Sequence, residues 1–201
     1  MAIPKVLLFD LGGVLVDGAG LRELALMLPR PMAPADLRHK WVTSPVVAQF
    51  ETGRCSSREF ASGFIDEWGL AISHDDFLER FTAWVGVPYP ETAELLSALG
   101  RQHALACISN TNVLHWESLR RMEALEHVLE RAFVSHELGL MKPSPEVFAQ
   151  VARELRCAPG DIAFFDDGQE NVDGAAKAGL SAHQTAGPVA LRNALGELGL
   201  L

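Results

Sequence analysis

The stretch Val6-Leu7-Leu8-Phe9-Asp10-Leu11-Gly12-Gly13 places an apolar run directly before an aspartate and a pair of glycines. A short apolar run that stops abruptly at polar residues is typical of a buried strand in a parallel sheet. Glycines after such a strand let the backbone turn tightly and approach a ligand. Asp10 is therefore predicted at the carboxyl end of a first strand, although an aspartate in this context is also common in ordinary turns.

Three more apolar runs end in the same way: Ala104 to Ile108 before Ser109, Ala132 to Val134 before Ser135, and Ile162 to Phe165 before Asp166. Between the runs lie helical patterns, at Glu91 to Leu99, Val113 to Met122, and Glu146 to Leu155 with Ser144 as its cap and Pro145 at its first position. This alternation predicts an α/β fold with a doubly wound parallel sheet. Ligands of such sheets bind beyond the carboxyl ends of the strands, so Asp10, Ser109 and Asp166 should face one crevice.

An insertion separates the first strand from the second. About ninety residues lie between Phe9 and Ala104, whereas a βαβ unit needs roughly thirty or more. Apolar residues recur there at helical spacing in four segments: 21–27, 35–41, 58–68 and 75–84. We predict a small helical cap domain over residues 15–88, closed by Pro88-Tyr89-Pro90, and an α/β core domain made of residues 1–14 and 89–201.

Composition narrows the class of protein. The chain has 201 residues, 48% of them hydrophobic, with 17 basic and 26 acidic side chains and a net charge of −9. Neither end carries a basic run, so nucleic acid and membrane surfaces are not expected partners. Cys55, Cys107 and Cys157 lack metal or redox spacing and are expected to be buried, reduced thiols in a cytoplasmic protein. The oligomeric state does not follow from the sequence.

Carboxylate side chains and hydrogen-bond donors come directly after the predicted strands. Asp166 and Asp167 are adjacent, and their mutual repulsion is costly unless a cation or hydrogen-bond donors lie nearby. One of them could instead cap the helix expected around Val172 to Ala178. With Asp10, the pair indicates a site for a hard metal ion. Ser109 and Asn110 offer hydrogen-bond donors, and Lys142 offers a positive charge. A serine after a strand is more often a helix cap, and a Lys-Pro pair is more often a solvated turn.

Taken in order, these segments resemble the four motifs of the haloacid dehalogenase-like (HAD-like) hydrolase superfamily, and the resemblance spans nearly the whole chain. The motifs correspond to Phe9 to Val14, Ser109-Asn110, Lys142-Pro143, and Phe165 to Asn171. The helical insertion after the first motif is similar to the small cap of one branch of that superfamily. Glu51-Thr52-Gly53 resembles a cap loop of its sugar-phosphatase-like members.

This resemblance implies a phosphatase acting on a small phosphate ester, including a sugar phosphate. Asp10 would be the nucleophile that forms an aspartyl-phosphate, and Lys142 would assist it. Mg²⁺ would be bound by Asp10, the Gly12 carbonyl and Asp167, while Asp166 and Asn171 would orient ligands or join them. Ser109, Asn110 and Gly12 would contact the substrate.

One position departs from the family pattern. Most phosphatases of the superfamily carry a second aspartate two residues after the nucleophile as general acid and base, and this chain has Gly12 there. Asp17 or Glu51 could substitute, but ordinary surface carboxylates are the favoured interpretation of both. Glycine at this position favours leaving groups that need little protonation. It also keeps two alternatives open: a haloacid dehalogenase, and a nearly inactive member that binds a phosphorylated ligand.

Overall fold

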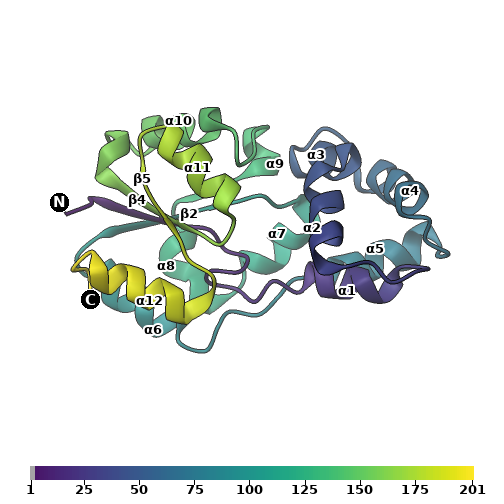
Figure 1. The fold of residues 1–201 in the computed structure, drawn as a ribbon, viewed down its shortest axis with the longest axis horizontal. Coiled ribbons are helices and arrows are strands. Elements are labelled where there is room, and N and C mark those ends of the chain that lie inside the picture. Colours follow the sequence, from purple (N-terminus) through teal and green to yellow (C-terminus); the bar gives the residue numbers. More distant parts are fainter. Residues whose placement is uncertain (1–2) are drawn as a thin grey trace.

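The computed structural model describes residues 3–201 and contains one five-stranded parallel sheet with the order β3-β2-β1-β4-β5 (Figure 1). The strands are β1 (Val6–Phe9), β2 (Ala104–Ser109), β3 (Ala132–Val134), β4 (Ile162–Asp166) and β5 (Ser181–Gln184). The four predicted strands are confirmed, as is the doubly wound α/β class. The fifth, β5, was not predicted, because Ser181, His183 and Gln184 give it no apolar run.

The register of the sheet aligns the strand ends that carry the predicted site. Phe9 pairs with Cys107 on β2 and with Phe165 on β4. Asp10 then continues the pairing, because its backbone N–H donates to the carbonyl of Phe165 at 2.9 Å. The residues that follow β1, β2 and β4 therefore lie at the same edge of the sheet.

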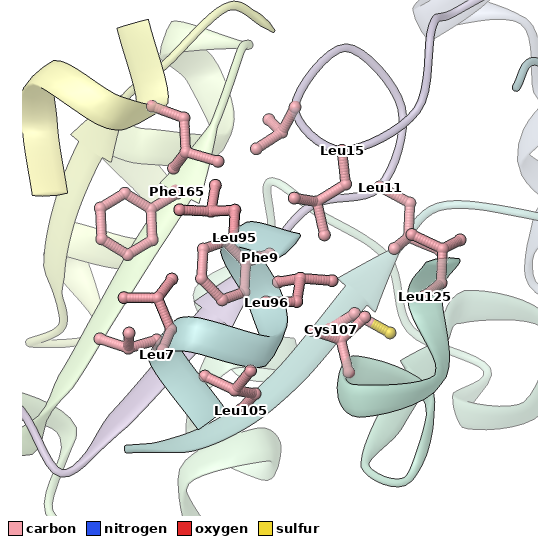
Figure 2. Close-up of a cluster of buried hydrophobic side chains, with 14 of the residues drawn as sticks. Leu7, Phe9, Leu11, Leu15, Leu95, Leu96, Leu105, Cys107, Leu125 and Phe165 are labelled. Atoms are coloured by element: carbon pink, nitrogen blue, oxygen red, sulfur yellow. The ribbon is translucent and has the colours of Figure 1, made fainter. Parts of the chain in front are cut away.

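Helices cover both faces of the sheet in the core. They are α6 (Thr92–Gly100), α7 (Val113–Leu119), α8 (Glu126–Leu129), α9 (Ser135–Leu138), α10 (Pro145–Glu154), α11 (Gln169–Lys177) and α12 (Gly187–Glu197), with 3₁₀ turns at Glu123–Leu125 and Pro159–Asp161. Leu7 and Phe9 pack into the apolar cluster on one face together with residues of α6, α8 and α12 (Figure 2). Val6 and Leu8 point to the other face and pack with residues of α10 and α11. The strands are thus buried on both faces, as their continuous apolar runs predicted.

The inserted segment folds into five helices beside the core (Figure 1): α1 (Gly20–Met27), α2 (Pro34–Thr43), α3 (Pro45–Glu51), α4 (Ser57–Trp68) and α5 (His74–Thr82). They have an apolar cluster of their own, in which the rings of Phe60, Phe64, Phe77 and Phe81 contact one another. The cap at residues 15–88 stays a prediction. Residues 1–2 of the predicted core range lie outside the described residues. Helix α3 was not predicted.

Three smaller expectations were tested by the structure. Pro145 begins α10 as predicted, but the Ser144 side chain makes no capping hydrogen bond and contacts Glu146 instead. Cys107 is buried, and burial raises the pKa of its thiol to about 12, whereas Cys55 and Cys157 are only partly buried and not fully so as predicted. Across residues 3–201, no helix has both the length and the apolar character that crossing a membrane requires.

Two connecting segments run side by side between core and cap. The N–H of Asp17 donates to the carbonyl of Val87 at 2.9 Å, and the N–H of Tyr89 donates to the carbonyl of Leu15 at 3.0 Å. Gly86 lies so close to the Asp17 carbonyl that a Cβ atom would overlap it. The absence of a side chain at Gly86 therefore allows the two connections to pair.

We predict that Gly86→Ala lowers the free energy of unfolding by about 1–3 kcal/mol, the usual cost of overpacking. The matched control is Gly196→Ala on α12, where an added Cβ meets nothing within 4 Å. That change should stabilise the protein by about 0.5–1 kcal/mol, because alanine favours a helix more than glycine does. Urea unfolding of both variants measures the difference, and equal stability of the two would contradict the packing argument.

Candidate active site

Asp10 occupies the turn directly after β1, at the edge of the sheet, with 8% of its surface exposed. Its Oδ1 atom accepts a hydrogen bond from the backbone N–H of Leu11 at 2.7 Å and lies 2.9 Å from Nζ of Lys142. Among residues 3–201, no hydrogen bond or ion pair involves its other oxygen, Oδ2. Asp10 is thus fixed through one oxygen, and the second is available to attack a substrate.

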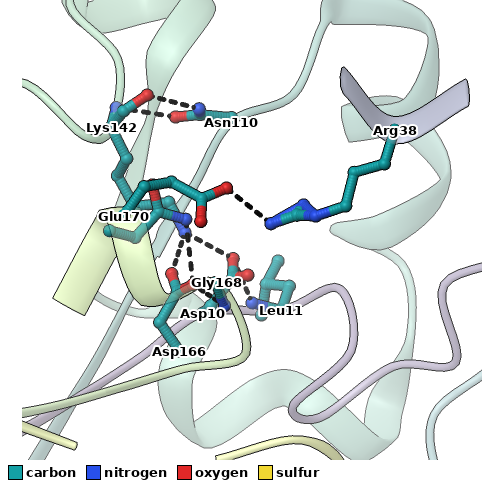
Figure 3. A network of polar contacts seen from close by, with 9 residues as sticks. Asp10, Leu11, Arg38, Asn110, Lys142, Asp166, Gly168 and Glu170 are labelled. Carbon is teal, nitrogen blue, oxygen red and sulfur yellow. Dashed lines mark hydrogen bonds and ion pairs between the residues drawn. The ribbon is translucent and has the colours of Figure 1, made fainter. Parts of the chain in front are cut away.

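Asp166 and Lys142 form the buried centre of the site (Figure 3), with 0% and 2% of their surfaces exposed. Nζ of Lys142 donates to Oδ2 of Asp166 at 2.6 Å. Oδ1 of Asp166 accepts from the Gly168 N–H at 2.8 Å and from Nδ2 of Asn171 at 2.9 Å. Both oxygens of Asp166 are therefore occupied, so in this arrangement the residue orients Lys142 and the turn before α11.

Asn110 holds the backbone of Lys142 (Figure 3). Its Oδ1 accepts from the Lys142 N–H at 2.9 Å, and its Nδ2 donates to the Lys142 carbonyl at 2.9 Å. The side-chain amide predicted to bind a phosphoryl group thus positions the lysine. The neighbouring Ser109 hydroxyl lines the cleft and has no hydrogen-bond partner among residues 3–201, so it is free to donate to a ligand.

Negative charge exceeds positive charge at this centre. Burial raises the pKa of Asp10 to about 7, an effect that Lys142 opposes and Asp166 reinforces. Burial and Asp166 likewise raise the pKa of Asp167. Burial alone would lower the pKa of Lys142, but its ion pairs with Asp10 and Asp166 outweigh burial and keep the pKa above its ordinary value. A single lysine charge thus faces three carboxylates.

The donor set fits a hard divalent cation. One carboxylate oxygen from each of Asp10, Asp166 and Asp167 lies within 4.8 Å of the others. Gly13 allows Asp167 to come this close, because a Cβ at Gly13 would lie 2.7 Å from Oδ2 of Asp167. Carboxylate and carbonyl oxygens are the ligands that Mg²⁺ prefers, and a cation would relieve the repulsion among the three groups.

A cleft of about 990 Å³ is lined by core residues that include Ser109, Lys142 and Asp167 and by residues of the cap. Trp41, Val47, Glu51 and Trp84 face it from the cap. Its size is in the range of sites for small-molecule ligands. The interpretation of Glu51 as a surface carboxylate was wrong, because only 8% of its surface is exposed, and that part faces the cleft. Asp17 does match its expectation, since it is ion-paired with Arg22 at 2.7 Å in an exposed position.

An ion pair connects cap and core at the cleft. Nη2 of Arg38 on α2 lies 2.6 Å from Oε1 of Glu170 on α11 (Figure 3). Both side chains are partly exposed, at 41% and 47%. Solvent screening weakens such a pair, so its contribution to stability is small.

We predict a coupling energy below about 1 kcal/mol between Arg38 and Glu170 in a double-mutant cycle of Arg38→Met and Glu170→Gln. The coupling should fall further as salt rises from about 0.05 M to about 0.5 M, because salt screens exposed charges. Urea unfolding of the four proteins measures it. A coupling above about 2 kcal/mol that salt does not change would show that this pair holds the cap onto the core.

The chain belongs to the haloacid dehalogenase-like hydrolase family, whose sequence model matches residues 4–179. This confirms the family resemblance and the predicted class of enzyme, a hydrolase. The D-ribitol-5-phosphate phosphatase of Bacteroides thetaiotaomicron is 25% identical over 175 residues, which cover 84% of this chain and 85% of that protein. The phosphoglycolate phosphatase of Mannheimia succiniciproducens is 25% identical over 196 residues, which cover 89% and 84%.

Solved structures show the same fold. A HAD family enzyme from Bacteroides thetaiotaomicron, crystallised with magnesium and inorganic phosphate, has a TM-score of 0.72 and 24% identity over 92% of this chain and 94% of that one. The L-2-haloacid dehalogenase of Xanthobacter autotrophicus has a TM-score of 0.70 and 19% identity over 97% and 83%. The same fold is thus found in an enzyme crystallised with magnesium and phosphate and in a dehalogenase.

Proposed function

We propose that this protein is a magnesium-dependent phosphatase that hydrolyses a small phosphorylated metabolite through an aspartyl-phosphate on Asp10. The observation that carries the proposal is the position of Lys142, with Nζ 2.9 Å from Asp10 and 2.6 Å from Asp166 under the cleft. A nucleophilic carboxylate next to a buried cation and two more carboxylates suits attack on a phosphorus atom that carries negative charge. Two relatives named as phosphatases, which match 84% and 89% of this chain, support a phosphatase.

Each residue of the site has its own role in the proposed reaction. Oδ2 of Asp10 attacks phosphorus as the bond to the leaving oxygen breaks, and water then cleaves the aspartyl-phosphate and restores the carboxylate. Lys142 and the Ser109 hydroxyl stabilise charge on the phosphoryl oxygens. Asn110, Asp166 and Asn171 keep Lys142 and the turn before α11 in place. Mg²⁺, held by Asp10, Asp167 and the Gly12 carbonyl, would offset a repulsion of about 4 kcal/mol between carboxylate and phosphate charges at ~4 Å.

The substrate we propose is a sugar or polyol phosphate. The cleft of about 990 Å³ has room for one beside the site. The relative named as a D-ribitol-5-phosphate phosphatase supports this class, since it matches most of the chain. Trp41 and Trp84 on the cap would pack on the carbon skeleton of the substrate.

Phosphate release tests the proposal. The panel contains ribitol 5-phosphate, other sugar phosphates, acyl phosphates, nucleotides and p-nitrophenyl phosphate, each with Mg²⁺ and with EDTA. We expect phosphate release to require Mg²⁺. The rate should be highest with the polyol and sugar phosphates. Halide release from 2-haloacids without metal would favour a dehalogenase instead. Binding of these esters without turnover would indicate a ligand-binding protein.

A further inference from the structure

Glu51 is a buried acidic residue whose carboxyl group has no structural partner. Among residues 3–201, no hydrogen bond or ion pair involves this carboxyl group, although 92% of the residue's surface is covered, since its exposed fraction is 8%. Burying a carboxyl group without a partner is costly, so packing alone does not account for it. The group opens into the cleft that contains Ser109 and Lys142.

Glu51 lines the same cleft as Ser109, Lys142 and Asp167. The charged groups that act on it are those of Lys142 and Asp10, both in the core. Burial is the largest influence on the pKa of Glu51 and raises it to about 7, with Asp10 acting in the same direction and Lys142 opposing both. A carboxyl group with such a pKa holds a proton in part of the molecules at neutral pH, as proton transfer in both directions requires.

The end of α3 is fixed to the core by two contacts. Gly53, with φ +69°, lies so close to the His136 carbonyl on α9 that a Cβ atom would overlap it. Nη2 of Arg54 donates to the Gly139 carbonyl at 3.3 Å. These contacts lie two and three residues after Glu51 in the chain, and they fix the end of α3 against the core beside the cleft.

Position 12, two residues after Asp10, supplies no acid to the cleft. Gly12 lines the cleft without any side chain, and a Cβ atom there would meet nothing within 4 Å. We propose that Glu51, delivered by cap helix α3, is the general acid and base of this active site and replaces the group that position 12 does not supply. This inference rests on the proposed phosphatase function.

In this proposal Glu51 makes both proton transfers of the reaction. In the first step the Asp10 oxygen forms a bond to phosphorus, the bond from phosphorus to the alkoxide oxygen breaks, and Glu51 gives its proton to that oxygen, so an alcohol leaves. In the second step the ionised Glu51 takes a proton from water as the water oxygen bonds to phosphorus. The bond between phosphorus and Asp10 then breaks, phosphate leaves, and Glu51 is protonated again.

Glu51→Gln tests the assignment, because the amide keeps the shape of the side chain but transfers no proton. With ribitol 5-phosphate, a poor leaving group, we expect kcat to fall by about 10²–10³-fold. With p-nitrophenyl phosphate, whose leaving group needs no proton, the first step should change by less than about threefold while the second step slows. Stopped-flow absorbance should then show a burst of p-nitrophenolate equal to the enzyme concentration. Glu79→Gln, at an exposed position on α5, is the matched control and should behave as the wild type.

A rescue variant separates proton transfer from structure. There is room for a carboxylate at position 12, so Gly12→Asp in the Glu51→Gln background should restore turnover of ribitol 5-phosphate by about tenfold or more. A purely structural role of Glu51 would slow both substrates equally, give no burst and resist this rescue, and that result overturns the inference. If the wild type hydrolyses the ester and Glu51→Gln stays within about threefold of it, the inference fails while the proposed function stands. An inactive wild type with every ester would instead remove the proposed function itself.

Discussion

Asp10→Asn should reduce phosphate release by about 10⁴-fold or more, because an amide oxygen does not form the covalent intermediate. The loss should appear in kcat with every substrate, since all of them react through the same residue. The fold should survive the change. The side-chain oxygen of asparagine still accepts the Leu11 N–H, and Lys142 keeps its ion pair with Asp166 at 2.6 Å.

Two measurements complete this test. Urea unfolding with EDTA should place Asp10→Asn within about 1.5 kcal/mol of the wild type, because the substituted carboxylate is buried among like charges. Asp66→Asn, at an exposed position near the end of α4, controls for a change from acid to amide and should keep full activity. Retention of activity by a correctly folded Asp10→Asn protein would refute the nucleophile assignment.

The sequence predicted the centre of the site because parallel strands end at one edge of a sheet. Asp10, Lys142, Asp166 and Asn171 lie together as the order of the motifs predicted. The role of Asn110 could not be derived in this way. Its amide binds the backbone of Lys142, which is 32 residues further along the chain, so nothing in the local pattern distinguishes this contact from a contact to substrate.

Glu51 shows where sequence patterns fail. Its helix, α3, is seven residues long and contains Val46 and Val47, so neither length nor helix propensity identified it. Gly53, two residues after Glu51, lies close to the carbonyl of His136, which is far away in the chain. A residue that is buried because the cap docks on the core need not belong to any periodic pattern of apolar residues in the sequence around it. The match of Glu51-Thr52-Gly53 to a cap loop was the available signal.

Lys142→Met should cost about 3–5 kcal/mol of unfolding free energy at pH 7 in EDTA, because it removes the cation from a buried cluster of carboxylates. Lys142 is 2% exposed and contacts both Asp10 and Asp166. Without it, repulsion and desolvation raise the pKa of Asp10 further in the folded state, because the charge of Lys142 no longer opposes them. The folded variant then binds more protons than the unfolded chain, so its stability falls as pH rises. The deficit relative to the wild type should therefore shrink between pH 7 and pH 5.

Addition of Mg²⁺ and the variant Lys177→Met are the controls for Lys142→Met. A divalent cation held by Asp10 and Asp167 replaces part of the lost positive charge, so Mg²⁺ should stabilise Lys142→Met more than it stabilises the wild type. Turnover should stay low even then, because the lysine charge that stabilises the phosphoryl oxygens is missing. Lys177→Met, at an exposed position on α11, should change neither stability nor activity. If Lys142→Met were as stable as Lys177→Met at every pH, the cluster would not depend on Lys142 for its charge balance, and the carboxylates would have to be protonated in the resting protein.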